Sequence, residues 1–333
     1  MANGEKKLPA GFNEYVDVAS AIETAKAHWQ DTGRTTRYST GLKVMDEYLG
    51  GGYGMENAGE VILIHATSKT FKSTLSMQLI RTPIEQGEKV GLIILEGTFW
   101  RAVRNFKQLF TNAGYDAADE ILEKNKDNIF AMSDRMSNGD FSMDDVIRWL
   151  ENCVVAHGVH LFLIDPIGYL SDYSNEWNVP EYKKESKFMK QLVQFADNTH
   201  STVICIQHNT KGNEFDNRHR EAAIGGSQSF SKSPTKVIEI RREGLIDESR
   251  PEIGRKMSME FYMGRDVPDK RYYPIVFHVC FHPDGKGKSI FCPVFRDQDH
   301  ADNELHNADK EKRKVWWGQV DTNSSDLEEM MYE

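Results

Sequence analysis

Five short apolar runs, separated by stretches of helical character, constrain the fold of this chain more than any other feature. The runs are VILIH (61–65), VGLIIL (90–95), NIFAM (128–132), VHLFLID (159–165) and STVICIQ (201–207). Apolar runs of this length are typical of strands buried on both faces, and helices between them supply the crossovers of a parallel sheet. We expect helices from about Lys72, over 142–157 and over 180–198. The sequence therefore predicts an α/β fold with a mainly parallel central sheet and helices on both faces.

After residue 235 the apolar runs follow one another with little helix between them. Strands are predicted at 236–242, 256–263, 272–281 and 288–295. Antiparallel strands need only short connections, whereas parallel strands need long crossovers. These C-terminal strands are therefore expected to extend the sheet in a partly antiparallel arrangement.

The chain is predicted to divide into three parts. Residues 1–36 are a leader with a linker helix, 37–298 form one large α/β domain, and 299–333 form a polar, acidic tail. In the leader, apolar residues at helical spacing over 15–29 predict a helix that packs on its own domain or on a neighbouring subunit. The tail ends in SSDLEEMMYE, which is either a solvated terminus or a contact for a partner protein.

Composition excludes some classes of protein and leaves others open. No run of about 18 apolar residues occurs, and the first 15 residues lack the apolar stretch of a secretory signal, so no membrane association is expected. The four cysteines show no C-x-x-C spacing, which argues against zinc and predicts reduced cysteines in a cytosolic protein. The net charge of −10 does not decide nucleic-acid binding, because phosphates respond to local Lys and Arg.

The segment HATSKTFKST, residues 65–74, stands directly between the first predicted strand and the first helix. A phosphate-binding loop uses backbone N–H groups around phosphate oxygens, a Lys that reaches the β- and γ-phosphates, and a Ser or Thr for Mg²⁺. Lys72 and Ser73 suit the last two roles, and Ala66 stands where the motif allows Gly or Ala. The predicted nucleotide-binding residues are Ala66, Thr67, Ser68, Lys69, Thr70, Phe71, Lys72, Ser73 and Thr74.

Phe71 departs from the usual form of this loop. The residue before the Lys is normally Gly, because the backbone there needs conformational freedom and the phosphate comes close. A residue other than Gly in the left-handed region costs about 1–2 kcal/mol. The segment by itself therefore fits a working phosphate loop and an ordinary strand-to-helix turn equally well.

Two carboxylates end predicted strands at the edge where ligands of open parallel sheets lie. Glu96 follows the run at 90–95, where a carboxylate can polarise the water that attacks a γ-phosphate. Asp165 ends the run at 159–165, where a carboxylate can order Mg²⁺ and water. Ser73 and Asp165 are thus the predicted metal ligands, while a surface Glu and a strand-ending Asp are the simpler interpretations.

The segment that leads into the first strand, STGLKVMDEYLGGGYGMENAGEVILIHA, carries a family resemblance. It has a Ser-Thr-Gly, a short helix with Asp46, a Gly-rich turn and Gly59-Glu60 before the strand. In order and spacing it resembles the RecA-like core of replicative hexameric DNA helicases, both DnaB-like proteins and phage primase-helicases. The resemblance covers roughly residues 15–296. It implies a RecA-like P-loop NTPase core with C-terminal antiparallel strands that binds ATP, or another NTP, with Mg²⁺.

The resemblance also assigns catalytic roles. His208, after STVICIQ, falls on the family's polar sensor of the γ-phosphate, with Gln207 as the alternative. Arg265 falls on the Arg that reaches the nucleotide of the adjacent subunit, although the Lys expected two residues earlier is Met263. A strand-capping His is the simpler interpretation of His208. The catalytic residues implied are Glu96, Lys72, Asp165, His208 and Arg265.

DNA contacts are implied for two segments after the fifth apolar run. KGNEFDNRHR is a charged loop, and AAIGGSQSFSKSPTKVIEIRRE resembles the family's Gly-Ser segment with its following hydrophobic-Ile-x-Ile-Arg strand. Backbone N–H groups and Lys or Arg side chains there would hold a phosphate backbone without reading sequence, and a surface loop is the simpler interpretation. The implied DNA-binding residues are Lys211, Arg218, Arg220, Gly225, Gly226, Ser227 and Lys232.

The resemblance implies an ATP-dependent, ring-forming replicative helicase that translocates on single-stranded DNA and unwinds duplex. It would be a homo-oligomer, a hexameric ring, in the cytoplasm of a bacterial or phage-infected cell, and its tail would contact a polymerase or primase. Two alternatives remain open at this point. One is a RecA/RadA-like recombinase or filament ATPase, and the other is a catalytically impaired structural or loader subunit, because of Phe71.

Overall fold

The computed structural model describes most of the α/β part of the chain. The chain divides into two units at residue 36, and every described residue belongs to the second unit, Arg37–Glu333. The residues described are 37–49, 51–54, 58–67, 70–95, 115–133, 143–167, 179–208, 233–245, 248–249, 254–264, 275–283 and 289–297. The helix predicted at 15–29 and the tail at 299–333 lie outside them.

The described strands form one nine-stranded sheet with the order β3-β2-β4-β5-β1-β6-β7-β8-β9. From β3 to β6 the neighbours are parallel, and β6–β7, β7–β8 and β8–β9 are antiparallel. The strands are β1 Glu60–Ala66, β2 Val90–Ile94, β3 Ile129–Ser133, β4 Leu161–Asp165, β5 Thr202–His208, β6 Lys236–Leu245, β7 Gly254–Gly264, β8 Ile275–Pro283 and β9 Ser289–Asp297.

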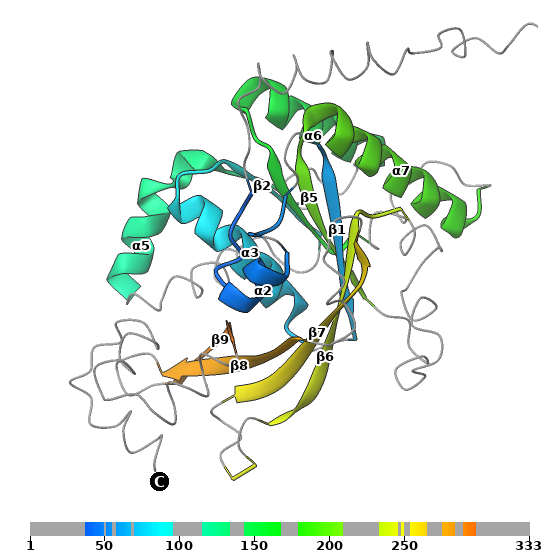
Figure 1. Ribbon diagram of the computed structural model, residues 1–333. Helices are drawn as coiled ribbons and strands as arrows, with labels where there is room; N and C mark the ends of the chain where they lie inside the picture. The colour runs from blue at the N-terminus through cyan, green and yellow to red at the C-terminus, as the bar shows by residue number, and fades with distance from the viewer. Residues whose placement is uncertain are drawn as a thin grey trace, which may run out of the picture. The chain divides into compact units, whose positions relative to one another are not determined.

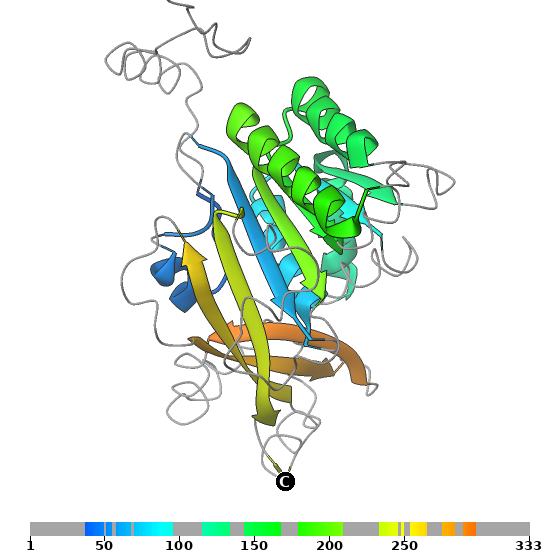
Figure 2. The ribbon, with the colours of Figure 1, turned by 90° about the vertical axis from the view of Figure 1, so that its right-hand side faces the viewer.

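Helices cover both faces of the parallel part of the sheet (Figures 1 and 2). Alternate residues of β1 point to the two sides: Val61 and Leu63 pack with α6 and α7, and Ile62 and Ile64 pack with α2 and α3. This alternation places an apolar core on each face. The helices are α2 Lys43–Tyr48, α3 Lys72–Glu85, α5 Tyr115–Lys124, α6 Met143–His157 and α7 Glu181–Thr199, with a 3₁₀ turn, η2, at Lys126–Asn128.

The predicted fold class is confirmed, and the predicted strands differ from the observed ones at their ends. The run at 159–165 becomes a strand only at Leu161, because Gly158 has a positive φ of 66° and ends the turn after α6. The strand predicted at 236–242 continues to Leu245, where its pairing with β7 also ends. Sequence patterns locate a strand by its apolar centre, whereas its ends depend on the partner strand.

Helix α7 lies directly on the beginning of β1. A Cβ atom added to Gly59 would stand 2.0 Å from the carbonyl carbon of Ala196 and 2.2 Å from its oxygen. Backbone therefore meets backbone at this point, and only glycine leaves the necessary space. The contact fixes the height of α7 above the strand that leads to the phosphate loop.

Two of the four cysteines lie among the described side chains, and both are free and buried. Cys153 lies on α6 and Cys205 on β5. Burial raises the pKa of the Cys153 thiol to about 11 and that of Cys205 further. In the described ranges, no helix is long and apolar enough to cross a membrane, and no cluster of three or more His, Cys, Asp or Glu could hold a metal ion.

Candidate nucleotide-binding site

Three of the predicted site positions meet at the carboxyl edge of neighbouring strands. Strand β5 lies between β1 and β4, so the ends of these three strands are adjacent. In the register, Ala66 at the end of β1 pairs with His208 at the end of β5, and Ile164 of β4 pairs with Cys205. Asp165 ends β4 and is 7% exposed. The fold thus gathers the start of the phosphate loop, His208 and Asp165 at one edge.

Phe71 adopts the backbone conformation that glycine normally supplies in such a loop. Its φ and ψ are 62° and 25°, in the left-handed region, and helix α3 begins at the next residue. The helix is closed onto this residue, because the backbone N–H of Leu75 donates to the carbonyl oxygen of Phe71 at 2.9 Å. The strain is about 1–2 kcal/mol. The ring packs against the apolar core on the α3 face of the sheet, and this contact offsets part of the strain.

The Lys72 side chain turns back into the loop instead of extending into water. Its Nζ donates hydrogen bonds to the carbonyl oxygens of Ala66 at 2.9 Å and Thr67 at 2.6 Å, and the residue is 5% exposed. The Thr70 hydroxyl donates to the same Thr67 carbonyl at 2.8 Å. The ammonium group is thus held inside a turn of backbone at the N-terminus of α3, where helix-end N–H groups favour anions.

Strand β2 is joined to β4 at the edge where Asp165 lies. The backbone N–H of Leu95, just beyond β2, donates to the carbonyl oxygen of Asp165 at 2.9 Å. Ile94 is the register partner of Asp165. Glu96 follows Leu95 directly in the sequence and lies outside the described residues.

A row of polar residues, three of them buried, crosses four strands one position before this edge. The register pairs His65 of β1 with Gln207 of β5 and with Glu239 of β6, and Glu239 with Glu260 of β7. Directly paired residues share a face of the sheet. His65 is 0% exposed, and both Gln207 and Glu239 are 6% exposed.

Arg241 connects the two carboxylates of this row. Its Nη2 donates to Glu239 Oε2 at 2.6 Å and lies 4.0 Å from Glu260 Oε2. The hydrogen bond to Glu239 raises the pKa of the Arg241 guanidinium, and the charge of Glu260 adds to it. Sequence reasoning missed the row, although polar residues inside the apolar runs VILIHA and KVIEIRR were the available signal.

The opposite, amino edge of the sheet holds a buried ion pair. Lys236 Nζ donates to Glu60 Oε1, and the two side chains are 5% and 0% exposed. The other carboxylate oxygen of Glu60 accepts the backbone N–H of Gly54. Glu60 thus joins the Gly-rich turn, the first residue of β1 and the first residue of β6. This contact gives a structural reason for the Gly59-Glu60 pair at the start of β1.

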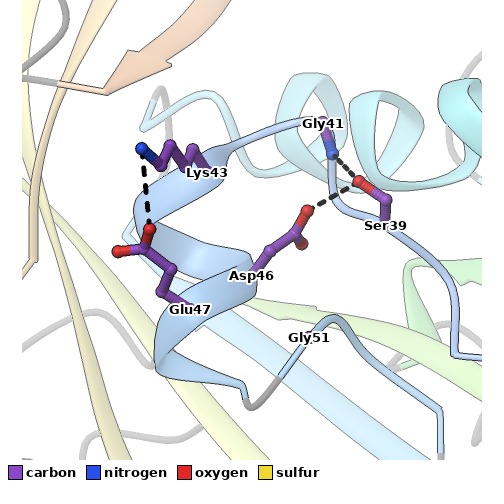
Figure 3. Close-up of a pocket in the computed structure, with 6 residues that line it drawn as sticks. All are labelled: Ser39, Gly41, Lys43, Asp46, Glu47 and Gly51. Carbon is purple, nitrogen blue, oxygen red and sulfur yellow. Dashed lines mark hydrogen bonds and ion pairs between the residues drawn. The ribbon is translucent and has the colours of Figure 1, made fainter.

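The Ser-Thr-Gly segment and Asp46 form a compact hydrogen-bonded turn (Figure 3). Asp46 accepts hydrogen bonds from the Ser39 hydroxyl at 2.6 Å, and from the backbone N–H and hydroxyl of Thr40 at 2.7 and 2.6 Å. A shallow pocket opens beside the turn. Its lining residues are Ser39, Gly41, Lys43, Asp46, Glu47 and Gly51.

This pocket lies far from the phosphate loop. A Cβ atom on Gly41 would stand 2.9 Å from the Thr82 hydroxyl, and Thr82 follows Lys72 by ten residues on α3, about 15 Å along the helix axis. The Asp46 carboxylate is already engaged by Ser39 and Thr40. We therefore assign the turn to the folding of the entry segment and not to nucleotide binding.

Eleven predicted site residues lie outside the described ranges. They are Ser68, Lys69, Glu96, Lys211, Arg218, Arg220, Gly225, Gly226, Ser227, Lys232 and Arg265.

Comparisons with known proteins agree with the fold. Residues 50–214 match the AAA domain family. A solved ATPase domain superposes with a TM-score of 0.63 at 13% identity, over 83% of this chain and 99% of that one. A KaiC-like protein, PH0186 from the archaeon Pyrococcus horikoshii OT3, superposes with a TM-score of 0.53 at 17% identity, over 79% and 99%.

The three comparisons differ in how much they establish. A search of the curated proteins found no match. At identities of 13% and 17% the two structural matches show the fold alone. The family match over residues 50–214 includes the phosphate loop and Asp165. The chain therefore has the fold of RecA-like P-loop NTPases and resembles the DnaB-like helicase family, and its residues 50–214 match the AAA domain family.

Proposed function

We propose that the protein is an ATP-dependent, ring-forming replicative DNA helicase that translocates on single-stranded DNA and unwinds duplex. The observation that carries the proposal is the edge where β1, β5 and β4 end, which holds Lys72, His208 and Asp165 together. The sequence resemblance to DnaB-like cores supplies the helicase part. The family match and the fold supply the ATPase part.

Lys72 suits a phosphate-binding role because its present partners are replaceable. Two carbonyl oxygens of its own loop hold the ammonium group. Phosphate oxygens carry negative charge, so they attract the ammonium group more strongly than neutral carbonyl oxygens do. We expect the β- and γ-phosphates of ATP to take the place of the Ala66 and Thr67 carbonyls. The N-terminus of α3 adds favourable potential at the same point.

Ser73 and Asp165 have the oxygen atoms that Mg²⁺ prefers. Two strand spacings, about 10 Å, separate β1 from β4, which leaves room for a hydrated ion with phosphate oxygens between the two residues. When bound, the ion would neutralise charge that builds on the transferred phosphoryl group. Ser73 would then be a direct ligand, and Asp165 would order the ion or its water.

The remaining catalytic roles are proposed from the resemblance and from strand position. Glu96 would act as the base that orients the attacking water, since it follows Leu95, whose N–H is bonded to Asp165. His208 would sense the γ-phosphate from the end of β5, with Gln207 as the alternative. Arg265, directly after β7, would reach the nucleotide of the next subunit in a ring.

The single-stranded DNA is proposed to lie against the chain between β5 and β6. Lys211, Arg218, Arg220 and Lys232 would meet its phosphates there, together with the backbone N–H groups of 225–227. Contacts of this kind predict binding that weakens steeply with salt and shows no sequence preference.

The test is ATP hydrolysis with and without single-stranded DNA, followed by unwinding of a forked duplex. We expect hydrolysis that DNA stimulates, strand separation that requires ATP, and loss of both in Lys72→Ala. Electron microscopy of the protein with ATP and DNA should show closed rings. Helical filaments in place of rings would support the recombinase alternative. Absence of nucleotide binding would support a structural or loader subunit and would contradict the proposal.

A further inference from the structure

We propose that Phe71 is a positioning residue whose ring anchors the phosphate loop in its binding conformation before nucleotide arrives. The proposal rests on the ATP-binding function proposed above. The usual motif has glycine at this position, and a bulky side chain there would be expected to obstruct the loop. We assign Phe71 the opposite role.

The first observation is that the loop has the required backbone geometry with phenylalanine in place. Phe71 has a φ of 62° and a ψ of 25°, and α3 starts at Lys72 without interruption. The Leu75 N–H closes the first helical turn onto the Phe71 carbonyl oxygen at 2.9 Å. Phenylalanine therefore reaches the left-handed conformation that glycine reaches in the usual motif.

The second observation is where the side chain goes. The Phe71 ring is half-buried and packs against the apolar core between the sheet and α3. That core includes Ala66, at the start of the same loop, and Leu75, one turn into the helix. The ring is thus bound on the core side of the loop, and the polar atoms of the loop keep their own contacts. Lys72 and Thr70 both reach the Thr67 carbonyl with phenylalanine present.

These observations have a consequence for binding. Glycine takes positive and negative φ with similar ease, so a glycine loop must be ordered when phosphate binds. An anchored phenylalanine is already held at positive φ, and the ordering occurs on folding. Binding to a preordered loop costs less entropy, so the anchor should raise nucleotide affinity and leave the chemical step unchanged.

The experiment compares Phe71→Gly, Phe71→Leu and wild type in the full-length protein. Affinity for fluorescently labelled ATP and steady-state hydrolysis are measured side by side. For Phe71→Gly we expect binding weaker by about tenfold, equivalent to about 1.4 kcal/mol, with KM raised and kcat within about twofold of wild type. Phe71→Leu keeps an apolar anchor and should recover most of the affinity. If Phe71→Gly binds ATP as tightly as wild type, or more tightly, phenylalanine is an obstruction and the proposal is wrong.

A second measurement separates this proposal from the proposed function. Amide hydrogen exchange of residues 70–75 is followed without nucleotide. We expect exchange at Leu75 to be at least about fivefold faster in Phe71→Gly than in wild type and close to wild type in Phe71→Leu. If the wild type binds no ATP but shows this pattern, the ATPase function fails and the anchor stands. Equal exchange in all three proteins overturns the anchor, whatever the outcome with ATP.

Discussion

The two edges of the parallel sheet each bury a lysine, and the two lysines are held in different ways. Lys72 at the carboxyl edge and Lys236 at the amino edge are 5% and 4% exposed. Lys236 is paired with the carboxylate of Glu60, whereas Lys72 donates to two carbonyl oxygens of its own loop. A buried ion pair that joins two strands is a fixed part of the structure, whereas an ammonium group that contacts the carbonyl oxygens of a loop lies where a phosphate could take their place.

The amino edge of the sheet holds the fold together, and the carboxyl edge carries the proposed site. At the amino edge, Glu60 connects three segments of the chain, and Thr235 exchanges hydrogen bonds with Val61 in both directions, at 2.8 and 3.2 Å. At the carboxyl edge, Phe71 is strained and Asp165 is a buried carboxylate. Changes at the amino edge should therefore lower stability, and changes at the carboxyl edge should lower activity.

The largest effect is expected from breaking the buried ion pair. Lys236→Met leaves the Glu60 carboxylate buried without its ammonium partner, which costs about 3–5 kcal/mol. The free energy of unfolding, measured by denaturant titration, should fall by this amount. The matched control is the double variant Glu60→Gln with Lys236→Met, which removes both charges and should recover most of the loss. Equal stability of Lys236→Met and wild type would mean that the pair is not a fixed part of the fold.

The next effect is expected at the other lysine. Lys72→Ala removes the ammonium group from the phosphate loop, and ATP hydrolysis should fall by roughly 100-fold or more, as when a transition-state donor is removed. The unfolding free energy should stay within about 1 kcal/mol of wild type, because truncating Lys72 opens the loop to water, which can hydrogen-bond to the Ala66 and Thr67 carbonyls. A loss of stability as large as that of Lys236→Met would erase the distinction between the edges.

A smaller effect is expected where α7 touches β1. Gly59→Ala would place a methyl group 2.0 Å from the Ala196 backbone, and the overpacking should cost about 1–3 kcal/mol of unfolding free energy. ATP affinity should not change in the folded protein. Gly244→Ala is the control, because a Cβ there meets nothing within 4 Å. If both variants lose the same stability, the loss does not come from the contact with α7.

The smallest effect is expected for Asp165→Asn. The amide keeps the shape of the buried side chain and removes the negative charge that would order Mg²⁺, so stability should stay close to wild type. The Mg²⁺ concentration for half-maximal hydrolysis should rise roughly tenfold. The measurement is a Mg²⁺ titration of the ATPase rate. An unchanged Mg²⁺ requirement would remove Asp165 from the proposed site and leave β4 a purely structural strand.

Much of the fold could be predicted from the sequence because its strands are continuous apolar runs. The runs at 90–95 and 128–132 became β2 and β3 with shifts of one residue at their ends. The change from a parallel core to an antiparallel extension was also predicted, since the sequence shows little helical character between the apolar runs after residue 235. Local composition reveals the parallel strands, because a strand that is buried on both faces needs apolar residues along its whole length.

The site was less accessible to sequence reasoning. The turn between the first strand and the first helix could be located, but the place of the Phe71 side chain depends on a core assembled from several strands and α3, which no local pattern reveals. The Glu60–Lys236 pair joins residues 176 positions apart. The row from Gln207 to Glu260 exists only through the register of four strands. All three features depend on which strands and helices pack together in the folded protein. Residue spacing along the sequence does not reveal that packing.

The position of β1 between β5 and β6 has a mechanical consequence. The register joins β1 to β5 from Glu60 to Ala66, and to β6 from Ile62 to His65. The chain between His208 and Ser233 leaves from the first of these neighbours and returns to the second. A pull on that stretch would load the hydrogen bonds on both flanks of β1 in shear, where many bonds share the force at once. Strand β1 should therefore resist stretching, and its C-terminal end leads into the phosphate loop.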